Sequence, residues 1–276
     1  MLIDCHHHYF LNEKNYLEKL VKECERLKID KLCLAAGGEE MGLADNKMIK
    51  KAFSKYSDLF IGFGYVRLGI NGAGTVDELY SQGFKGIKVT RPKYNYDDKR
   101  FYPIYARAAA LNIPILFHTG TVMRTKVDEF FDISSNRMRP IYLDTIARAF
   151  PKLRIIGAHL GNPWYDEASM TLFWNSNVYF DLSGSTLKRK GADFFREKLW
   201  WVGDTLKKLA QDPDKTWYNE AFNRHPFEKI LFGTDVPYYE IKQVIDEHEK
   251  VLQDLGLPNN LKRKVFGETM AGILNL

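Results

Sequence analysis

The first nine residues, Met1-Leu2-Ile3-Asp4-Cys5-His6-His7-His8-Tyr9, are the main indication of the fold. An apolar pair runs into three histidines, which predicts a short buried strand that delivers imidazoles at its carboxyl end. Successive side chains of a strand point to opposite faces, so His6 and His8 share one face and His7 points away. A remnant of an expression tag is the alternative, although tags are normally longer. The stretch predicts a metal-binding pair, His6 and His8.

Short apolar segments and segments of helical spacing alternate along the rest of the chain. The strands expected after the first are 29–36, 59–66, 86–89, 113–118, 153–159, 178–182 and 229–232, and the helices are 12–28, 46–56, 75–82, 102–111, 141–150, 165–175, 192–210 and 241–255. This alternation indicates a parallel sheet with helical crossovers. An open doubly wound sheet would usually carry a glycine-rich turn after its first strand, where this chain has histidines. We therefore predict an α/β fold, a (β/α)8 TIM barrel that forms a single domain over 1–276.

Composition limits the classes of partner. The 276 residues include 40 basic and 35 acidic side chains, and no basic block or nucleic-acid motif is present. No apolar run is long enough to cross a bilayer. Cys5, Cys24 and Cys33 show no C-x-x-C spacing, which argues against a disulfide framework and a thiolate zinc site. We expect a cytoplasmic protein that binds a small molecule and neither nucleic acid nor membrane, and a homodimer stays open.

Chemically versatile side chains follow several of the expected strands. His118 ends the fifth strand, His159 ends the sixth, and Asp235 follows the eighth. All strand ends of a barrel meet at one mouth, so these residues are expected to join the first-strand pair. Imidazoles and a carboxylate suit zinc and other divalent first-row metals. We predict His6, His8, His118 and Asp235 as metal ligands, with His159 beside them.

Two long segments, 119–140 and 184–227, also follow strand ends, where a barrel builds its active site and lid. Several arginines fall in loops expected at the mouth, and a guanidinium can hold a carboxylate through two hydrogen bonds. These are Arg91, Arg124, Arg137 and Arg139. They favour a substrate that carries a carboxylate. Asp181, at the end of the seventh strand, is expected either to orient a ligand histidine or to cap the Ser183-Gly184 turn.

Four motifs in this order resemble the amidohydrolase superfamily. They are Ile3-Asp4-x-His6-x-His8, Phe117-His118-Thr119-Gly120, Ala158-His159-Leu160-Gly161 and Phe232-Gly233-Thr234-Asp235-x-Pro237. The resemblance is to the amidohydrolase-2 group of metal-dependent barrels, which holds hydrolases and non-oxidative decarboxylases. It extends from residue 2 to the tail around residue 270. The motifs are specific for fold and metal dependence and say little about the substrate.

The resemblance implies roles for individual residues. The residues that would hold a divalent ion, Zn²⁺ first with Mn²⁺, Fe²⁺ or Co²⁺ as alternatives, are His6, His8, His118 and Asp235. His159 would polarise a substrate carbonyl or act as acid and base, and Asp235 could also accept a proton from water. Dinuclear relatives use a carboxylated lysine or a glutamate on the fourth strand as a bridge. We prefer one metal and keep Lys88, which lies on that strand, as a bridge or a substrate contact.

Three functions stay open at this point. The first is a hydrolase that uses a metal-activated water to cleave an ester, lactone or amide bond in a small anionic substrate. The second is a decarboxylase that removes carbon dioxide from an aromatic or unsaturated acid with the same ion. The third is an inactive barrel that serves as a binding protein, which the presence of every expected ligand disfavours.

Overall fold

A computed structural model of the protein describes residues 1–125, 128, 132–184, 189–199 and 224–276. Eight parallel strands pair in sequence order into one sheet. They are β1 (Ile3–His8), β2 (Lys31–Ala35), β3 (Phe60–Tyr65), β4 (Gly86–Val89), β5 (Ile115–Phe117), β6 (Ile155–Gly157), β7 (Val178–Asp181) and β8 (Ile230–Leu231). The first strand meets the end of the last, because the Cys5 N–H donates to the Phe232 carbonyl at 3.0 Å. The predicted (β/α)8 barrel is confirmed.

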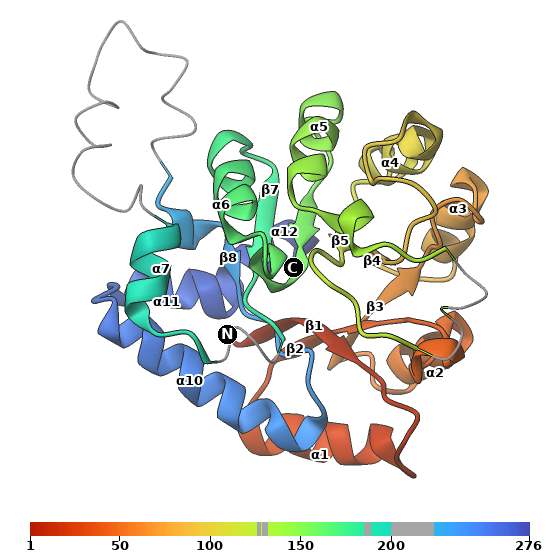
Figure 1. Ribbon diagram of the computed structural model, residues 1–276. Coiled ribbons are helices and arrows are strands. Elements are labelled where there is room, and N and C mark those ends of the chain that lie inside the picture. Colours follow the sequence, from red (N-terminus) through yellow and green to blue (C-terminus); the bar gives the residue numbers. More distant parts are fainter. Residues whose placement is uncertain (126–127, 129–131, 185–188, 200–223) are drawn as a thin grey trace, which may run out of the picture.

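Helices follow the strands and surround the sheet (Figure 1). They are α1 (Tyr16–Leu27), α2 (Asn46–Lys55), α3 (Ala73–Ser81), α4 (Tyr102–Ala110), α5 (Ile141–Ala149), α6 (Tyr165–Trp174), α7 (Ala192–Lys198), α10 (Ile241–Asp254), α11 (Asn259–Arg263) and α12 (Thr269–Leu274). The helix expected over 192–210 begins with α7, and its residues 200–210 lie outside the described part of the chain. None of the helices in the described ranges is long and apolar enough to cross a membrane.

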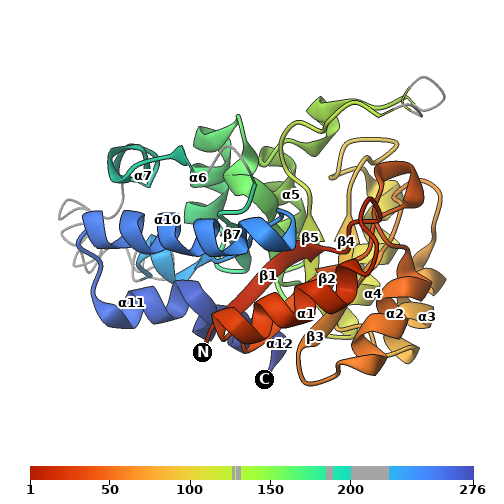
Figure 2. The ribbon, with the colours of Figure 1, turned by 90° about the horizontal axis from the view of Figure 1, so that it is seen from below.

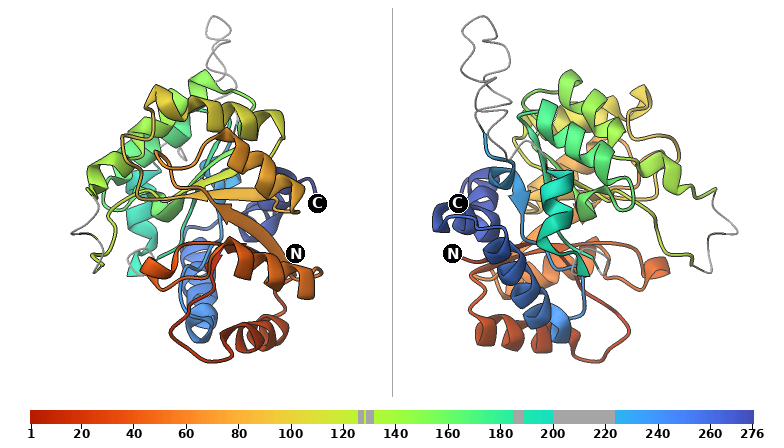
Figure 3. Two further views of the ribbon diagram at one scale, coloured as in Figure 1. Left: turned by 90° about the vertical axis from the view of Figure 1, so that its right-hand side faces the viewer. Right: turned by 60° about the vertical axis from the view of Figure 1, so that its left-hand side comes forward.

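Apolar side chains form two layers, one on each face of the sheet. Leu32 and Leu34 of β2 pack outward against the helices, whereas Cys33 and Ala35 belong to a separate cluster inside the barrel. Helix α12 contributes Met270, Ala271 and Ile273 to the inner cluster. It contacts β1, and the two chain ends lie near each other at this end of the barrel (Figures 2 and 3). The inner layer therefore fills one end of the barrel and leaves polar residues at the other.

The first strand contains a bulge that sets the direction of its histidines. Asp4 pairs with Leu32 of β2 and His7 pairs with Leu34. Three positions of β1 therefore lie opposite two of β2, so β1 carries one extra residue between Asp4 and His7. Cys5 belongs to the inner apolar cluster. Strict alternation from Cys5 would have turned His6 and His8 outward. The bulge lets both histidines face the interior, and His7 shares the outer face with Asp4.

Candidate metal centre

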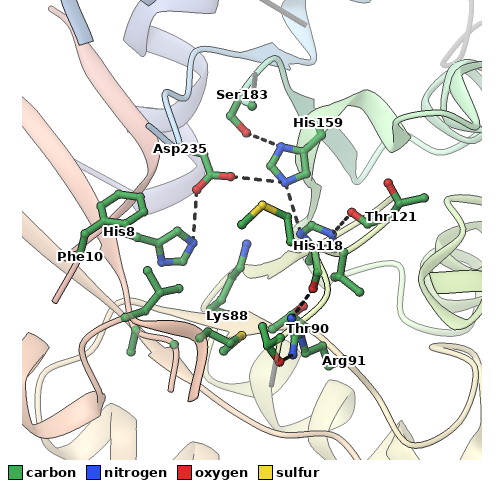
Figure 4. Close-up of a pocket in the computed structure, with 18 of the residues that line it drawn as sticks. His8, Phe10, Lys88, Thr90, Arg91, His118, Thr121, His159, Ser183 and Asp235 are labelled. Carbon is green, nitrogen blue, oxygen red and sulfur yellow. Dashed lines mark hydrogen bonds and ion pairs between the residues drawn. The ribbon is translucent and has the colours of Figure 1, made fainter. Parts of the chain in front are cut away.

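Five predicted site residues meet at the carboxyl ends of their strands, and Figure 4 shows His8, His118, His159 and Asp235 among them. His6 and His8 end β1, His118 follows β5, His159 lies two residues beyond β6, and Asp235 follows β8. All of them except His6 line a cavity of about 450 Å³. His6 is fully buried directly beside it. The structure thus brings together residues as far apart in sequence as His6 and Asp235, which are separated by 229 positions.

Some nitrogen and oxygen atoms of these side chains lie at separations typical of ligands around one ion. Nε2 of His6 and Nε2 of His8 are 3.3 Å apart, and Nε2 of His8 is 3.6 Å from Oδ1 of Asp235. In a tetrahedral site with zinc–nitrogen bonds of 2.0–2.1 Å, two ligand atoms are roughly 3.3 Å apart. His6, His159 and Asp235 each offer one atom within 4.8 Å of the others. The donor set and its spacing fit a divalent metal ion.

Hydrogen bonds at the far side of the rings decide which nitrogen is free. Nδ1 of His8 is 2.8 Å from the carbonyl of Ala35, and Nε2 of His118 is 3.2 Å from the carbonyl of Thr121. A carbonyl only accepts, so these two nitrogens carry the ring hydrogens. The lone pairs of His8 Nε2 and His118 Nδ1 are therefore directed toward the cluster.

His6 and His159 are oriented in the same way by Asp181 and Ser183. Oδ2 of Asp181 accepts a hydrogen bond from Nδ1 of His6 at 2.9 Å. The Ser183 hydroxyl donates to Oδ1 of Asp181 at 2.5 Å, which leaves its oxygen to accept from Nδ1 of His159 at 2.9 Å. Nε2 of both rings is then unprotonated. Nε2 of His159 lies 3.3 Å from Nδ1 of His118, so two lone pairs face each other, an arrangement that a bound cation would stabilise.

Burial sets the protonation of the cluster. It lowers the pKa of His8 to about 3 and holds the pKa values of His118 and His159 below their usual range. These rings are therefore neutral at pH 7, as metal binding requires. Burial opposes ionisation of Asp235, but the neighbouring imidazoles and Lys88 still bring the pKa of its carboxyl below the ordinary value. The centre combines neutral nitrogen donors with one carboxylate.

Lys88 of β4 points into the same space (Figure 4). Its Nζ donates to Nε2 of His6 at 2.8 Å, and the side chain is only 2% exposed. Burial lowers the pKa of Lys88 to about 8, against the opposing effect of Asp235 and Asp181. A cation accordingly faces the lone pair of His6.

The backbone is left-handed at three non-glycine residues that line the cavity. The φ angles are 61° at His159, 46° at Asp235 and 49° at Arg91. Such values are uncommon outside glycine and persist only where the surroundings hold them. Oδ1 of Asp181 accepts the His159 N–H at 2.8 Å, and the His6 carbonyl accepts the Asp235 N–H at 2.8 Å. The side-chain positions of His159 and Asp235 are thus fixed through their main chain.

Both expected roles of Asp181 are seen, since it orients His6 and also caps the turn by accepting the Ser183 N–H at 2.9 Å.

Asp181→Asn is expected to lower Zn²⁺ affinity by about 10- to 100-fold, the range found when such supporting groups are lost. The amide of the variant cannot accept every hydrogen bond that the Asp181 carboxylate accepts. The rings of His6 and His159 therefore lose their fixed orientation. Competition with a chromophoric chelator measures the affinity, and Asp144→Asn, far from the cavity, is the control. Equal affinities in parent and Asp181→Asn would refute this role.

The predicted arginines lie in different environments. Arg91 lines the cavity, and its guanidinium bonds to Asp128 at 3.0 Å and to the Met123 carbonyl at 2.8 Å, while its Nε is buried and has no partner among the residues that the structure describes. Arg137 is paired with Asp132, and Arg124 is exposed. Neither belongs to the described residues that line the cavity, and Arg139, which pairs with Glu167, is not among them either. Substrate contact by Arg124 and Arg137 stays a prediction from sequence.

Part of the cavity lining is apolar, and the sequence did not indicate it. Its residues come from the end of β1, the connection after β2 and the segment after β5, and they are Phe10, Ala36, Met41, Leu43, Val122 and Met123. Phe10 lies two residues after the histidine strand, which is the one hint available in the sequence. The others lie in loops without periodic spacing, where side-chain direction cannot be predicted.

Comparisons with known proteins agree with the barrel fold. The sequence model of a family described as amidohydrolase matches residues 39–276. No curated protein matches the chain. Solved structures resemble it over most of its length at low identity. One, described as a probable 2-pyrone-4,6-dicarboxylic acid hydrolase from Acinetobacter baumannii with citric acid bound, has a TM-score of 0.59 and 13% identity, covering 100% of this chain and 99% of that one.

Two further structures are decarboxylases that contain manganese. The dihydroxybenzoic acid decarboxylase from Polaromonas sp. JS666, with the inhibitor 2-nitroresorcinol, has a TM-score of 0.60 and 16% identity over 93% of this chain and 85% of that one. The 5-carboxyvanillate decarboxylase from Novosphingobium aromaticivorans, with 4-hydroxy-3-methoxy-5-nitrobenzoic acid, has a TM-score of 0.59 and 18% identity over 93% and 79%. At these identities the likeness establishes the shared barrel fold.

Proposed function

The chain belongs to the amidohydrolase-2 family, and on that premise we propose that it is a metal-dependent hydrolase that cleaves an ester, lactone or amide bond in a small anionic substrate. The observation that carries this proposal is the convergence of imidazole lone pairs beside the Asp235 carboxylate. Four rings have their outer nitrogens bonded to the protein, so their inner nitrogens are directed into the cluster, where Lys88 bonds to that of His6 and a bound cation could be held by the others. A binding protein without chemistry would not need this arrangement.

The proposed ligands are His6, His8, His118 and Asp235, which would hold one divalent ion, Zn²⁺ first. Neutral imidazoles and a carboxylate are the donors that zinc and its first-row neighbours accept. When bound, such an ion polarises a carbonyl oxygen and brings the pKa of water toward neutrality. Manganese occupies two of the similar structures, so Mn²⁺ is the first alternative.

His159, Asp235 and Lys88 are proposed to handle protons and charge. Nε2 of His159 lies 3.6 Å from Oδ2 of Asp235, and the ring lines the cavity with its other nitrogen anchored to Ser183. In this position His159 can carry a proton to or from the reacting carbonyl, and Asp235 can accept one from the attacking water. The Lys88 ammonium can bind an anionic oxygen of the substrate.

The lining of the cavity indicates the shape of the substrate. Lys88 and Arg91 supply the cationic groups among the described lining residues, and apolar side chains such as Phe10 line the same cavity. A volume of about 450 Å³ is in the range of small-molecule sites. We propose a compact carboxylate whose apolar body contacts Phe10 and whose reactive group is directed to the histidines.

A decarboxylase is the second candidate, since several similar structures carry that description. Metal-loaded protein incubated with carboxylated lactones and with aromatic acids in ¹⁸O-labelled water separates the two reactions. Hydrolysis incorporates one labelled oxygen into the product and releases no carbon dioxide, which is the expected result. Release of carbon dioxide without label in the product would replace the hydrolase by the lyase.

A further inference from the structure

A buried chain of hydrogen bonds lies behind the metal centre, on the outer face of β1. The Asp4 carboxylate accepts the Thr234 hydroxyl at 2.5 Å and the Thr234 N–H at 3.1 Å. Oγ1 of Thr234 is 2.8 Å from Nδ1 of His7, and Nε2 of His7 is 3.1 Å from the Tyr16 hydroxyl. All four side chains are buried, and none of them lines the cavity.

The donors and acceptors of this chain run in one direction. The Thr234 hydroxyl donates to Asp4, so its oxygen accepts from Nδ1–H of His7. Nε2 of His7 then accepts from the Tyr16 hydroxyl, whose oxygen accepts the Tyr238 N–H at 3.2 Å. Each link satisfies the next, and the neutral imidazole of His7 uses both of its nitrogens. His7 is therefore a connecting group between β1, α1 and the segment after β8.

This chain of hydrogen bonds holds the backbone on both sides of Asp235 in the sequence. Thr234 directly precedes it, and Tyr238, whose N–H is the last donor of the chain, follows three residues later. Between them Asp235 has the left-handed φ of 46° and donates its N–H to the His6 carbonyl. A strained conformation of this kind persists only where neighbouring bonds enforce it. The carboxylate thus reaches the cluster in Figure 4 because the residues around it are bonded behind the sheet.

We propose that Asp4, His7, Thr234 and Tyr16 are positioning residues that set the Asp235 carboxylate at the metal centre. This inference rests on the proposed function. It gives His7, which points away from the cluster, an indirect effect on metal affinity. The effect is exerted through the backbone of Asp235 and requires no contact with the ion.

Thr234→Val tests the proposal, because valine has nearly the shape of threonine and lacks the hydroxyl that joins Asp4 to His7. Zn²⁺ affinity, measured by chelator competition, is expected to fall by about 10- to 100-fold. Thr234→Ser retains the hydroxyl and is expected to bind Zn²⁺ within about threefold of the parent, a minor change beside the effect of a lost supporting group. His7→Leu breaks the same chain at its next link and is expected to follow Thr234→Val.

Ser169→Ala is the control for loss of a buried hydroxyl, since the Ser169 hydroxyl donates to the Lys198 carbonyl away from the cavity. It is expected to leave Zn²⁺ affinity unchanged. Parental affinity in both Thr234→Val and His7→Leu would overturn the proposal.

Amide hydrogen exchange of the metal-free protein provides a second readout that does not depend on the ion. The N–H groups of Thr234 and Asp235 are expected to exchange at least about tenfold faster in Thr234→Val, and at parental rates in Ser169→Ala. Unchanged exchange would overturn the inference even if Zn²⁺ affinity fell. If the parent binds no Zn²⁺ but exchange is faster in Thr234→Val, the proposed function is refuted, whereas the structural role of the hydrogen-bond chain is supported.

Discussion

Zn²⁺ affinity is expected to fall by at least about a thousandfold when His6 and His8 are both replaced by alanine, because the site then loses two of its four proposed donors. Turnover of any substrate is expected to disappear together with the metal. The two rings supply Nε2 atoms 3.3 Å apart. His7, the remaining imidazole of β1, is bonded to Thr234 and Tyr16 on the outer face and is not expected to replace them. Chelator competition and elemental analysis of the purified variant measure the loss.

His248→Gln is the matched control for this double variant. His248 is also a buried histidine, but it lies on α10 and its nitrogens contact the carbonyls of Val244 and Leu182. Its replacement is expected to leave the metal content at the parental value. Retention of the metal by the variant lacking His6 and His8, or equal loss in His248→Gln, would exclude the first strand as the source of ligands.

His159→Ala is expected to lower turnover by about 10²- to 10⁴-fold, the usual contribution of a positioned acid or base. Most of the metal is expected to remain, because the four proposed ligands are intact. Single-turnover rates and metal content, determined on the same preparation, separate the two effects.

The geometry gives this variant a second use. His159 lies with His6 and Asp235 in the set of side chains that could hold one ion. Complete loss of metal from His159→Ala would therefore place His159 among the ligands. Parental turnover with metal retained would remove it from the chemistry altogether.

The barrel was predictable because its signals are local. Apolar strands and helical spacing alternate, and each predicted strand lies within a few residues of an observed one. The helices α11 and α12 were not predicted, although Met270 and Ile273 of α12 belong to the apolar cluster inside the barrel. Their segment follows the last strand–helix unit, so the repeating alternation gave no reason to expect them.

The candidate centre was predictable in its members and less so in its geometry. Histidines at strand ends identified His6, His8, His118 and His159 because a barrel brings those ends together. The bulge in β1 was not predictable, since it depends on pairing with β2 rather than on the order of residues in β1. The role of His7 in the buried chain of hydrogen bonds was also not predictable, because its partner Thr234 is distant in sequence and the contact with Tyr16 depends on how α1 packs.

Loop residues set the limit of the sequence-based predictions for substrate contacts. Arg91, Arg124 and Arg137 all follow strand ends, yet only Arg91 lines the cavity, and its guanidinium is bonded to Asp128. The apolar residues Met41 and Leu43 line the same space without any pattern that indicates it. Their directions are set by the packing of individual loops. The proposal of a carboxylate substrate therefore rests on Lys88 and Arg91 more than on the number of arginines near the mouth.

The metal content of the purified parent protein, determined by elemental analysis after purification with and without added Zn²⁺ or Mn²⁺, tests the central claim most directly. About one equivalent of a transition metal per chain is the result expected for a mononuclear site with four protein ligands. Two equivalents would give Lys88 a bridging role. The absence of any bound metal, even after Zn²⁺ and Mn²⁺ have been supplied, would contradict a metal-dependent hydrolase.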